Sequence, residues 1–592
     1  METTNSFKSY SKVDELQEQE YRRRTRKRLI IITVSTIILI IIIVGALVGT
    51  LTGKATSKNT LRPTYSSESI TAICNVTQYP ASCDSSIASL KSSSNITDAN
   101  PNPEKLFQLS MQVAVNELTK LLSWPDELIS SETYSNITND PAVQAALDDC
   151  KFLFQDAVDH INDSITSFQV GQMSGKQIND IRTWLSTAIT NQDTCLDGIY
   201  EATNHTILPQ YMKHAMRNAT EATSNCLAIA SNILTILLHY VQTPNNRKLL
   251  TVERIYQYRT LNDAFPEWIR NGYRKLLQEE NPIVDVIVAK DGSGDFETIN
   301  EAIKLIPKKS TLRFVVYVKE GVYEENVNIT KDYWNVMIYG DGMNKTIVSG
   351  SLNKIDGTPT FFSGTFIAAG RGFIARDMGF RNTAGPEKHQ AVALRSSSDK
   401  SVFYRCSFEA YQDTLYTHSN RQFYRDCQII GTIDFIFGNA AVVFQNCSIQ
   451  PRQPMPNQFI TITAQSKTDP NQNTGMSIQR AEITPFDNLT ATTYLGRPWK
   501  DYATTLFMQS DIGGFLDPEG WAQWVDGVDP PNTILYAEYQ NTGPGSVTDG
   551  RVRWDGVRPN ITEAEALKFS VESFIQGSQW LPDASVMFDG SL

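Results

Sequence analysis

The strongest constraint on the fold of this chain is a repeat of about 21 residues in its C-terminal half. Cys406, Cys427 and Cys447 follow one another at steps of 21 and 20 residues. Short runs rich in β-branched and aromatic residues, separated by Gly, Asn and Asp, accompany this period. Such a period is typical of a β-solenoid, in which equivalent positions stack about 4.8 Å apart. The pattern predicts an all-β right-handed parallel β-helix over residues 282–592, with a β-propeller or sandwich as the alternative.

The same period brings polar side chains together. Asp413 and Asp434 are 21 residues apart, and Gln390 and Gln412 are 22 apart. Two neighbouring carboxylates acquire different pKa values, which suits one as nucleophile and the other as proton donor. Two amides beside them can stabilise an oxyanion. We therefore expect an acyl-transfer site here; the alternative is that these side chains cap turns or form stacked ladders.

Other hydrolytic chemistries lack their motifs. The sequence has no Gly-x-Ser-x-Gly, no His-Glu-x-x-His and no Cys-x-x-Cys. Only His389 and His418 occur in residues 282–592, and His389, beside Gln390, is interpreted as structural. We expect no metal and no cofactor.

Residues 68–240 predict an all-α domain. From Cys150 to Ile161, apolar residues recur at helical spacing. Cys74 and Cys83 are close enough to link a short hairpin, and Cys150 and Cys195 could join two long helices, which leaves Cys226 unpaired. Spacing alone does not fix these pairs.

The N-terminal residues predict entry into the secretory pathway. Residues 29–51 are almost wholly apolar, long enough to cross a bilayer, and follow a basic tail at 1–28. We expect an uncleaved transmembrane signal anchor with a cytosolic N-terminus and a stalk at 52–67; a cleaved signal peptide is the alternative. Many Asn-x-Ser/Thr sequons after the anchor predict a glycoprotein. The net charge of −11 argues against nucleic acid as a partner.

A linker at 241–281 carries one tetrapeptide twice. Arg-Lys-Leu-Leu occupies Arg247, Lys248, Leu249 and Leu250, and again Arg274, Lys275, Leu276 and Leu277. A dibasic pair in an extended linker favours proteolysis. The repeat therefore predicts cleavage by a processing protease, although two dibasic pairs could also occur by chance.

Several segments together resemble the plant pectin methylesterases (pectinesterases) with an inhibitor-like pro-region. They are Asp291-Gly-Ser-Gly-Asp-Phe296, Gly321-Val-Tyr-Glu-Glu325, Gln390-Ala-Val-Ala-Leu-Arg395, Tyr411–Tyr416, Gly431–Gly438, Leu495-Gly-Arg-Pro-Trp499, Tyr536-Ala-Glu-Tyr539 and Gly543-Pro-Gly-Ser546. The resemblance extends over about residues 68–592. Residues 70–235 look like the four-helix-bundle domain of pectin methylesterase and invertase inhibitors.

The resemblance implies a function and roles for the matching residues. The activity would be hydrolysis of C6 methyl esters of homogalacturonan in the plant cell wall, through an aspartyl acyl-enzyme. The implied catalytic residues are Asp434 as nucleophile, Asp413 as proton donor and base, and Gln412 as transition-state stabiliser. The implied substrate-binding residues are Thr360, Gln390, Arg497 and Trp499.

The resemblance also implies partners and a disulfide. Pectin would be the substrate, and both the chain's own helical domain and separate pectin methylesterase inhibitor proteins would bind the esterase. The precursor would be membrane-anchored, and the mature enzyme would act in the cell wall. The resemblance favours a disulfide between Cys427 and Cys447, with Cys406 free.

Two other functions remain open at this stage. Paired carboxylates also serve glycosidases, so another β-helix pectin enzyme is an alternative; a lyase would instead need Ca²⁺ ligands and a base. The helical domain could also make the chain chiefly an inhibitor or binding protein, against which the set Gln390, Gln412, Asp413, Asp434 and Arg497 argues.

Overall fold

The computed structural model describes residues 65–93, 103–131, 135–168, 174–203, 207–242 and 283–592. The expected basic tail and membrane anchor lie outside these residues, as does nearly all of the stalk and the linker. Among the described helices, none is both long and apolar enough to cross a bilayer.

The first described part of the chain is all-α, as predicted. Its helices are α2 (Tyr65–Cys74), α3 (Pro80–Ser93), α4 (Pro103–Lys120), α5 (Trp124–Ile129), α6 (Ser135–Thr138), α7 (Pro141–Ser167), α8 (Gly175–Ala202) and α9 (Ile207–Gln242). The long helices α4, α7, α8 and α9 pack against one another around one apolar core. We call this part the helical domain.

Local sequence explains where the two central helices begin. The Asp140 carboxylate accepts a hydrogen bond from the Ala142 N–H, and Pro141 occupies the first helical position of α7. At the start of α8, Ser174 and Gln177 form a reciprocal capping box.

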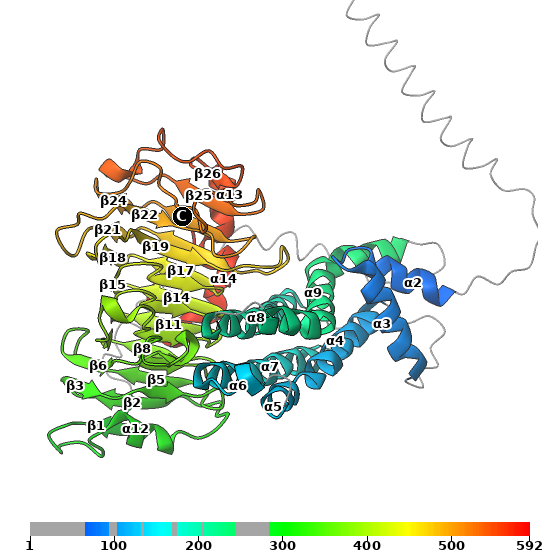
Figure 1. Ribbon diagram of the computed structural model, residues 1–592, viewed down its shortest axis with the longest axis horizontal. Helices are drawn as coiled ribbons and strands as arrows, with labels where there is room; N and C mark the ends of the chain where they lie inside the picture. Colours follow the sequence, from blue (N-terminus) through cyan, green and yellow to red (C-terminus); the bar gives the residue numbers. More distant parts are fainter. Residues whose placement is uncertain (1–64, 94–102, 132–134, 169–173, 204–206, 243–282) are drawn as a thin grey trace, which may run out of the picture. The chain divides into compact units, whose positions relative to one another are not determined.

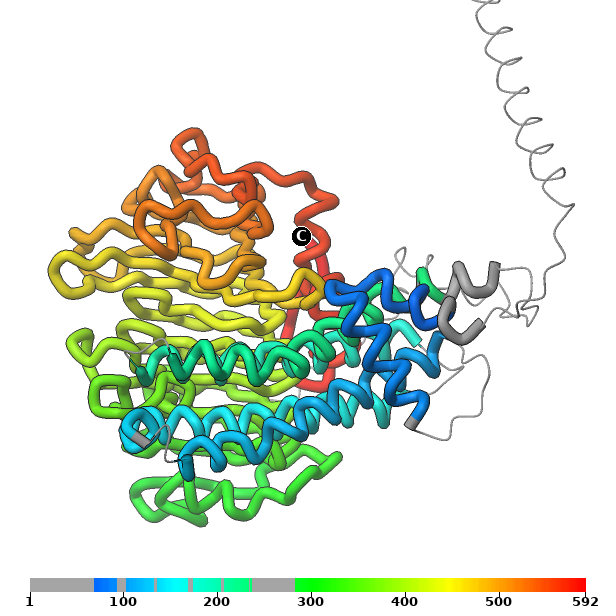
Figure 2. Tube along the Cα trace, turned by 45° about the vertical axis from the view of Figure 1, so that its right-hand side comes forward, coloured from blue at the N-terminus to red at the C-terminus, as the bar shows by residue number. Residues whose placement is uncertain are grey.

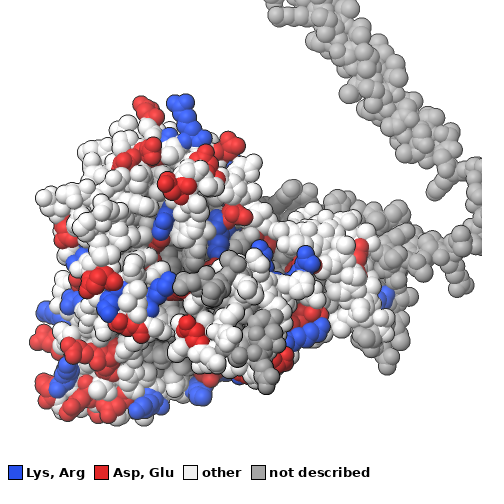
Figure 3. Space-filling view, in the orientation of Figure 1, with Lys and Arg blue, Asp and Glu red and all other residues white. Residues whose placement is uncertain are grey.

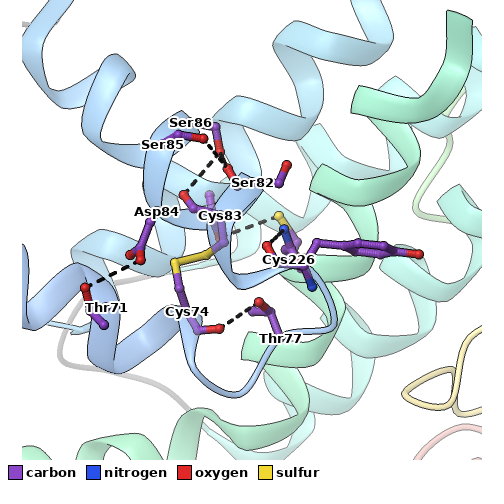
Figure 4. The surroundings of a disulfide bond; sticks show 12 residues. Thr71, Cys74, Thr77, Ser82, Cys83, Asp84, Ser85, Ser86 and Cys226 are labelled. Carbon is purple, nitrogen blue, oxygen red and sulfur yellow. Dashed lines mark hydrogen bonds between the residues drawn. A yellow bond between two sulfur atoms is a disulfide. The ribbon is translucent and has the colours of Figure 1, made fainter. Parts of the chain in front are cut away.

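Two disulfides of the helical domain are those expected. Cys74–Cys83 joins α2 to α3, and Cys150–Cys195 joins α7 to α8. Cys226 of α9 is a buried thiol close to the first of these disulfides (Figure 4). Burial raises the pKa of this thiol to about 12, so it stays protonated and unreactive at neutral pH.

Residues 283–592 form a parallel β-helix, as predicted, with three parallel sheets (Figure 1). Sheet 1 contains β1 (Val286–Val288), β2 (Phe314–Val318), β5 (Val336–Tyr339), β8 (Ile374–Arg376), β11 (Ser401–Tyr404), β14 (Arg421–Arg425), β17 (Ala441–Gln445), β20 (Gly475–Gln479), β23 (Thr504–Met508), β25 (Leu535–Tyr539) and β26 (Val557–Arg558). Sheet 2 contains β3 (Gly321–Glu324), β6 (Thr346–Gly350), β9 (Gly379–Asn382), β12 (Ser407–Glu409), β15 (Gln428–Gly431), β18 (Ser448–Pro451), β21 (Glu482–Ile483) and β24 (Asp511–Ile512). Sheet 3 contains β4 (Val327–Ile329), β7 (Phe366–Ala368), β10 (Leu394–Ser396), β13 (Leu415–Thr417), β16 (Ile436–Gly438), β19 (Ile460–Gln465) and β22 (Thr493–Gly496).

Short helices accompany the coils. They are α12 (Ile299–Ala302), α13 (Glu563–Ala566) and α14 (Val571–Ile575), with 3₁₀ turns that include η3 (Thr360–Phe362) and η4 (Pro386–Lys388). The C-terminal segment that contains α14 runs back along the coils (Figure 2). Val571, Ile575 and Trp580 of this segment pack on the outer face of sheet 1. They thereby cover apolar side chains that the coil would otherwise expose.

The repeated cysteines lie at the corner between sheets 1 and 2. The residue that follows a sheet 1 strand has a left-handed backbone in seven consecutive coils: Asp377, Arg405, Asp426, Asn446, Arg480, Gln509 and Gln540. One such residue turns the chain sharply, and the next side chain points into the corner of the core. Cys406, Cys427 and Cys447 occupy this inner position. The repeated cysteines therefore mark one inward-facing position of the coil.

The expected disulfide between Cys427 and Cys447 is wrong for this structure, because both are buried thiols. Their side chains come from equivalent, inward-facing positions of adjoining coils. Each sulfur contacts backbone carbonyl oxygens: Cys427 Sγ lies 3.3 Å from the Phe403 oxygen, and Cys447 Sγ lies 3.7 Å from the Tyr424 oxygen. The same stacking operates in the aromatic core, where Tyr424 lies between Phe403 and Phe444 at ring distances of 4.6 and 4.7 Å.

The helical domain packs against the outer face of sheet 3. Phe361, Val392, Tyr416 and Phe437 of the β-helix belong to the same apolar cluster as the core of the helical domain. Helix α8 crosses the strands from their C-terminal edge, where Asp180 binds Arg421, toward their N-terminal edge, where Glu201 meets Thr360. On the face drawn in Figure 3, Lys and Arg side chains are mixed with Asp and Glu rather than forming a field of one sign.

Candidate active site

The two carboxylates predicted from the repeat lie at equivalent positions of adjoining coils. Leu415 and Ile436 are in register between β13 and β16, and Asp413 and Asp434 each precede them by two residues. Both aspartates have a left-handed backbone, with φ of 65° and 52°. Aspartate tolerates this conformation better than most residues, and such backbone strain is frequent at functional sites. The two aspartates thus lie in equivalent turns of adjoining coils, at the N-terminal edge of sheet 3.

Asp434 is held by two neighbours that fix its orientation. Arg497 donates from Nε to Oδ1 at 2.8 Å and from Nη2 to Oδ2 at 2.6 Å, a bidentate pair. Thr461 Oγ1 donates to Oδ1 at 2.6 Å. Burial alone would lower the pKa of Arg497, but the Asp434 carboxylate more than offsets this and raises it. Asp434 therefore faces a permanent positive charge at hydrogen-bond distance.

Asp413 has the opposite electrostatic environment. The carboxyl group is 7% exposed, and burial raises its pKa well above the usual value. The charges of Asp434 and Glu201 raise the pKa further, against the smaller effects of Arg497 and Lys354. Asp413 thus keeps its proton at pH values at which an ordinary aspartate has lost it. Its neighbour Asp434 is instead bound to Arg497. Two carboxyl groups in such different environments can act as acid and nucleophile.

The two glutamines lie in neighbouring coils beside these carboxylates. The Ala391 N–H donates to the Gln412 carbonyl at 3.2 Å, so the chain after Gln390 pairs directly with the segment that carries Gln412. Both side chains are partly exposed. His389, just before Gln390, has φ of 57° and ψ of −132°, an unusual backbone conformation. The repeat alone did not indicate this strained residue.

Aromatic rings form a row across the outer face of sheet 3. Successive centroid distances are 6.4 Å for Phe361 to Tyr416, 4.1 Å for Tyr416 to Phe437, 6.3 Å for Phe437 to Trp499 and 6.0 Å for Trp499 to Trp524. The row runs from coil to coil past the two carboxylates. Apolar ring faces of this kind can pack against the faces of sugar rings. Of this row, the sequence singled out only Trp499 for a site role.

Carboxylates of α8 occupy the polar positions around this row. Glu201 accepts a hydrogen bond from Thr360 Oγ1 at 2.5 Å and lies 3.9 Å from Lys354 Nζ. Asp197 accepts from Lys500 Nζ at 2.5 Å. Burial raises the pKa of both carboxyl groups. The expected substrate contact Thr360 is thus engaged by the helical domain.

More ion pairs join the domains at the other edge of sheet 3. Asp180 pairs with Arg421 at 2.6 Å. In α7, Asp159 pairs with Lys331 and Asp163 pairs with Arg371. The helical domain therefore carries carboxylates and the face of the β-helix carries cations. These contacts join residues hundreds of positions apart, so the sequence did not reveal them.

Within the described residues, no group of three or more His, Cys, Asp or Glu side chains has an arrangement that could hold a metal ion. His418 is buried, with Nε2 3.0 Å from Thr194 Oγ1 and Nδ1 3.0 Å from Ser397 Oγ. Burial lowers the pKa of His418 well below its usual value, which makes it a neutral hydrogen-bonding group in the domain contact.

Comparisons with known proteins agree on both domains. A family model described as Pectinesterase matches residues 285–578, and one described as Plant invertase/pectin methylesterase inhibitor matches residues 68–229. Pectinesterase 3 of Phaseolus vulgaris is 53% identical over 100% of both chains, and Pectinesterase 1 of Arabidopsis thaliana is 48% identical over 99% of both. The solved pectin methylesterase from carrot is 50% identical with a TM-score of 0.52, and the match covers 53% of this chain and 99% of the carrot chain. That share of this chain is close to residues 283–592, so the β-helix domain has a counterpart that folds as a separate chain.

Proposed function

Because this chain belongs to the plant pectinesterase family, we propose that it hydrolyses the C6 methyl esters of homogalacturonan to pectate and methanol. The observation that carries this proposal is a pair of carboxyl groups in different environments. Asp434 accepts two hydrogen bonds from Arg497, and Asp413, one coil away, is buried with a raised pKa. This arrangement supplies an oriented carboxylate as nucleophile and a proton donor without a further group.

The first half-reaction is an acyl transfer. An Asp434 carboxylate oxygen attacks the C6 carbonyl carbon, and the ester oxygen leaves as methanol after it takes the proton of Asp413. The product is an anhydride between Asp434 and the galacturonate. The bidentate hydrogen bonds from Arg497 hold the Asp434 carboxylate in one orientation for this attack.

The second half-reaction releases the acyl group. Asp413, now ionised, takes a proton from water, and the hydroxide attacks the anhydride carbonyl. The galacturonyl group leaves as a carboxylic acid, which then loses its proton to solvent, and the Asp434 carboxylate and protonated Asp413 are restored. In both halves Gln412 and Gln390 would donate hydrogen bonds to the tetrahedral oxyanion.

The helical domain acts as an inhibitory pro-region in this proposal. Glu201 engages Thr360, and Asp197 engages Lys500 beside Trp499, so the polar groups at both sides of the aromatic row are occupied. Substrate reaches these groups only after the domain moves away. Separate inhibitor proteins of the same family would bind the same face.

We also infer maturation in the secretory pathway. The anchor at 29–51 would retain the precursor at a membrane, and cleavage in the linker at 241–281 would separate the esterase from both the anchor and the helical domain. The mature enzyme would then act in the cell wall. These steps extend the predictions from sequence.

The experiment replaces Asp434 with Asn in the separate domain 283–592. We expect methanol release from esterified pectin to be abolished, because the neutral amide is a poor nucleophile. Gln412→Ala should lose roughly 10²–10³-fold in turnover, the usual effect of removing one oxyanion donor. Gas chromatography measures methanol, and a reducing-end assay on the same samples distinguishes an esterase from a glycosidase.

Asp399→Asn is the matched control. Asp399 is also a buried aspartate paired with an arginine, Arg421, but it lies at the opposite edge of sheet 3. It should keep turnover near that of the wild type if the protein remains folded. Near-normal methanol release from folded Asp434→Asn would disprove the covalent mechanism.

A further inference from the structure

Arg395 is a buried cation without a carboxylate partner among the described residues. It is 1% exposed, and its Nε has no hydrogen-bond partner in the part of the chain that the structure describes. Within the same residues, its guanidinium makes one hydrogen bond, a long one of 3.4 Å from Nη1 to Ser397 Oγ. Every other arginine or lysine discussed above at the domain contact is paired with a carboxylate. Burying an unpaired charge is costly, so the position of Arg395 needs an explanation.

The helical domain is what buries this side chain. Phe152 of α7 packs on Phe361 and Phe362, at 6.3 and 5.8 Å between ring centroids, and the Arg395 guanidinium lies 3.5 Å from the centre of the Phe361 ring. Arg395 lines a cavity of about 200 Å³ between α7, α8 and sheet 3. Without the helical domain, the guanidinium would lie on the open face of the sheet.

Two carboxyl groups of α7, Asp149 and Asp156, act electrostatically on Arg395 without forming a salt bridge with it. Asp149 of α7 has a pKa of about 7, raised by burial and only partly lowered by Arg395. Its Oδ2 has no hydrogen-bond partner. The helical domain thus covers Arg395 without forming the ion pair that it forms with Lys500 and Arg421.

Arg395 occupies a defined place relative to the proposed catalytic residues. In sheet 3 it is in register with Tyr416, and Tyr416 is in register with Phe437, the residue three positions after Asp434. Arg395 is therefore two coils from the nucleophile, which is about 10 Å along the axis of the β-helix at the usual strand spacing. It stands on the aromatic row, beside Phe361. A sugar chain that follows this row past Asp434 would bring another residue of the polymer to Arg395.

We propose that Arg395 is a specificity-determining residue that binds the carboxylate of an already demethylated galacturonate, while a methyl ester of the same chain lies at Asp434. A guanidinium recognises a carboxylate by charge-assisted hydrogen bonds and has no equivalent bond to offer a methyl ester. The enzyme then binds partly demethylated pectin better than fully esterified pectin, and each product carboxylate favours reaction at a nearby ester. This inference rests on the proposed active site.

The test measures methanol release by domain 283–592 from two oligogalacturonides of equal length, one fully methyl-esterified and one partly de-esterified. Arg395→Gln should raise KM for the partly de-esterified substrate about 10-fold or more, the usual effect of losing a hydrogen bond to a charged group. The KM for the fully esterified substrate should stay within about 2-fold, as should kcat for both. Arg395→Lys should keep part of the preference. Polygalacturonate should inhibit the wild type more strongly than Arg395→Gln.

The matched control is Arg405→Gln, which removes an exposed arginine from the corner after β11, outside sheet 3. It should leave both KM values unchanged. An equal rise of KM for both substrates, no change in either, or failure of both Arg395 variants to fold would overturn the proposal and make Arg395 structural. If the wild-type domain released no methanol from the fully esterified substrate, that result would instead contradict the proposed active site.

Discussion

At the scale of single residues, the two domains place ionisable groups in unequal environments. Asp149 and Asp193 of the helical domain have pKa values of about 7 and 6, in both cases raised mainly by burial. Asp193 accepts a hydrogen bond from Thr468 of the β-helix at 2.5 Å, whereas Asp149 Oδ2 has none. Such groups bind protons in the folded chain at pH values where the unfolded chain has released them.

The first prediction at this scale concerns stability against pH. A raised carboxyl pKa means that the folded state holds more protons than the unfolded state between about pH 4 and 7, so stability falls as pH rises through that range. Asp149→Asn removes the contribution of this group, because an amide does not ionise. We expect its thermal unfolding temperature to fall less between pH 5 and 8 than that of the full-length wild type, measured by circular dichroism.

Asp148→Asn is the control, because Asp148 is the exposed neighbour on the same helix. It should preserve the pH dependence of the wild type. Identical pH profiles for Asp149→Asn and the wild type would mean that Asp149 is ionised in the folded chain, contrary to the argument from burial.

At the scale of elements, α8 is the helix that crosses sheet 3 next to the proposed catalytic residues. Its contacts are polar along the whole length: Asp180 with Arg421, Thr194 with His418, Asp197 with Lys500 and Glu201 with Thr360. The disulfide Cys150–Cys195 fixes this helix to α7. The inhibitory contact is therefore specific and charged, which makes it sensitive to removal of single carboxylates.

We expect Asp197→Asn to weaken this contact in the full-length, uncleaved chain. The pair is partly buried, with side chains 22% and 24% exposed, so its loss should matter more than that of a surface pair. Methanol release by the uncleaved chain should rise several-fold. Asp126→Asn removes a carboxylate paired with Lys151 within the helical domain, with both side chains well exposed, and should leave the uncleaved chain as inactive as the wild type. Equal activity of the two variants would show that this ion pair does not contribute to inhibition.

At the scale of the whole molecule, one chain carries both the esterase domain and the domain that covers it. A tether keeps the effective concentration of the helical domain high, so even a moderate contact inhibits until the chain is cut. Each cut of the linker would also separate the esterase from the predicted membrane anchor. Activation and release would then be one event.

Replacing both Arg-Lys-Leu-Leu segments, 247–250 and 274–277, with Ala or Ser tests this coupling. Plant cells should then accumulate a full-length precursor with little esterase activity, visible by immunoblot. Replacing only 247–250 should permit release, because the second segment lies nearer to β1 and is the better cleavage site. A secreted esterase of normal size and activity from the double variant would show that processing occurs elsewhere.

Sequence alone determined the features that repeat locally along the chain. The 21-residue period predicted the β-helix and the pairing of Asp413 with Asp434, because one coil per repeat stacks equivalent positions at the strand spacing. Helical periodicity predicted the helical domain in the same way. The resemblance then supplied roles for Arg497 and Trp499, which no period could have indicated.

Only the tertiary structure decided the state of side chains whose partners are distant in sequence. Cys427 and Cys447 have the spacing of a neighbouring pair, but in the structure they are buried thiols whose sulfurs contact backbone carbonyl oxygens. The engagement of Thr360 by Glu201 and the unpaired burial of Arg395 arise only when the helical domain packs on sheet 3. Periodicity reports which residues share a face, whereas burial and charge pairing depend on what covers that face.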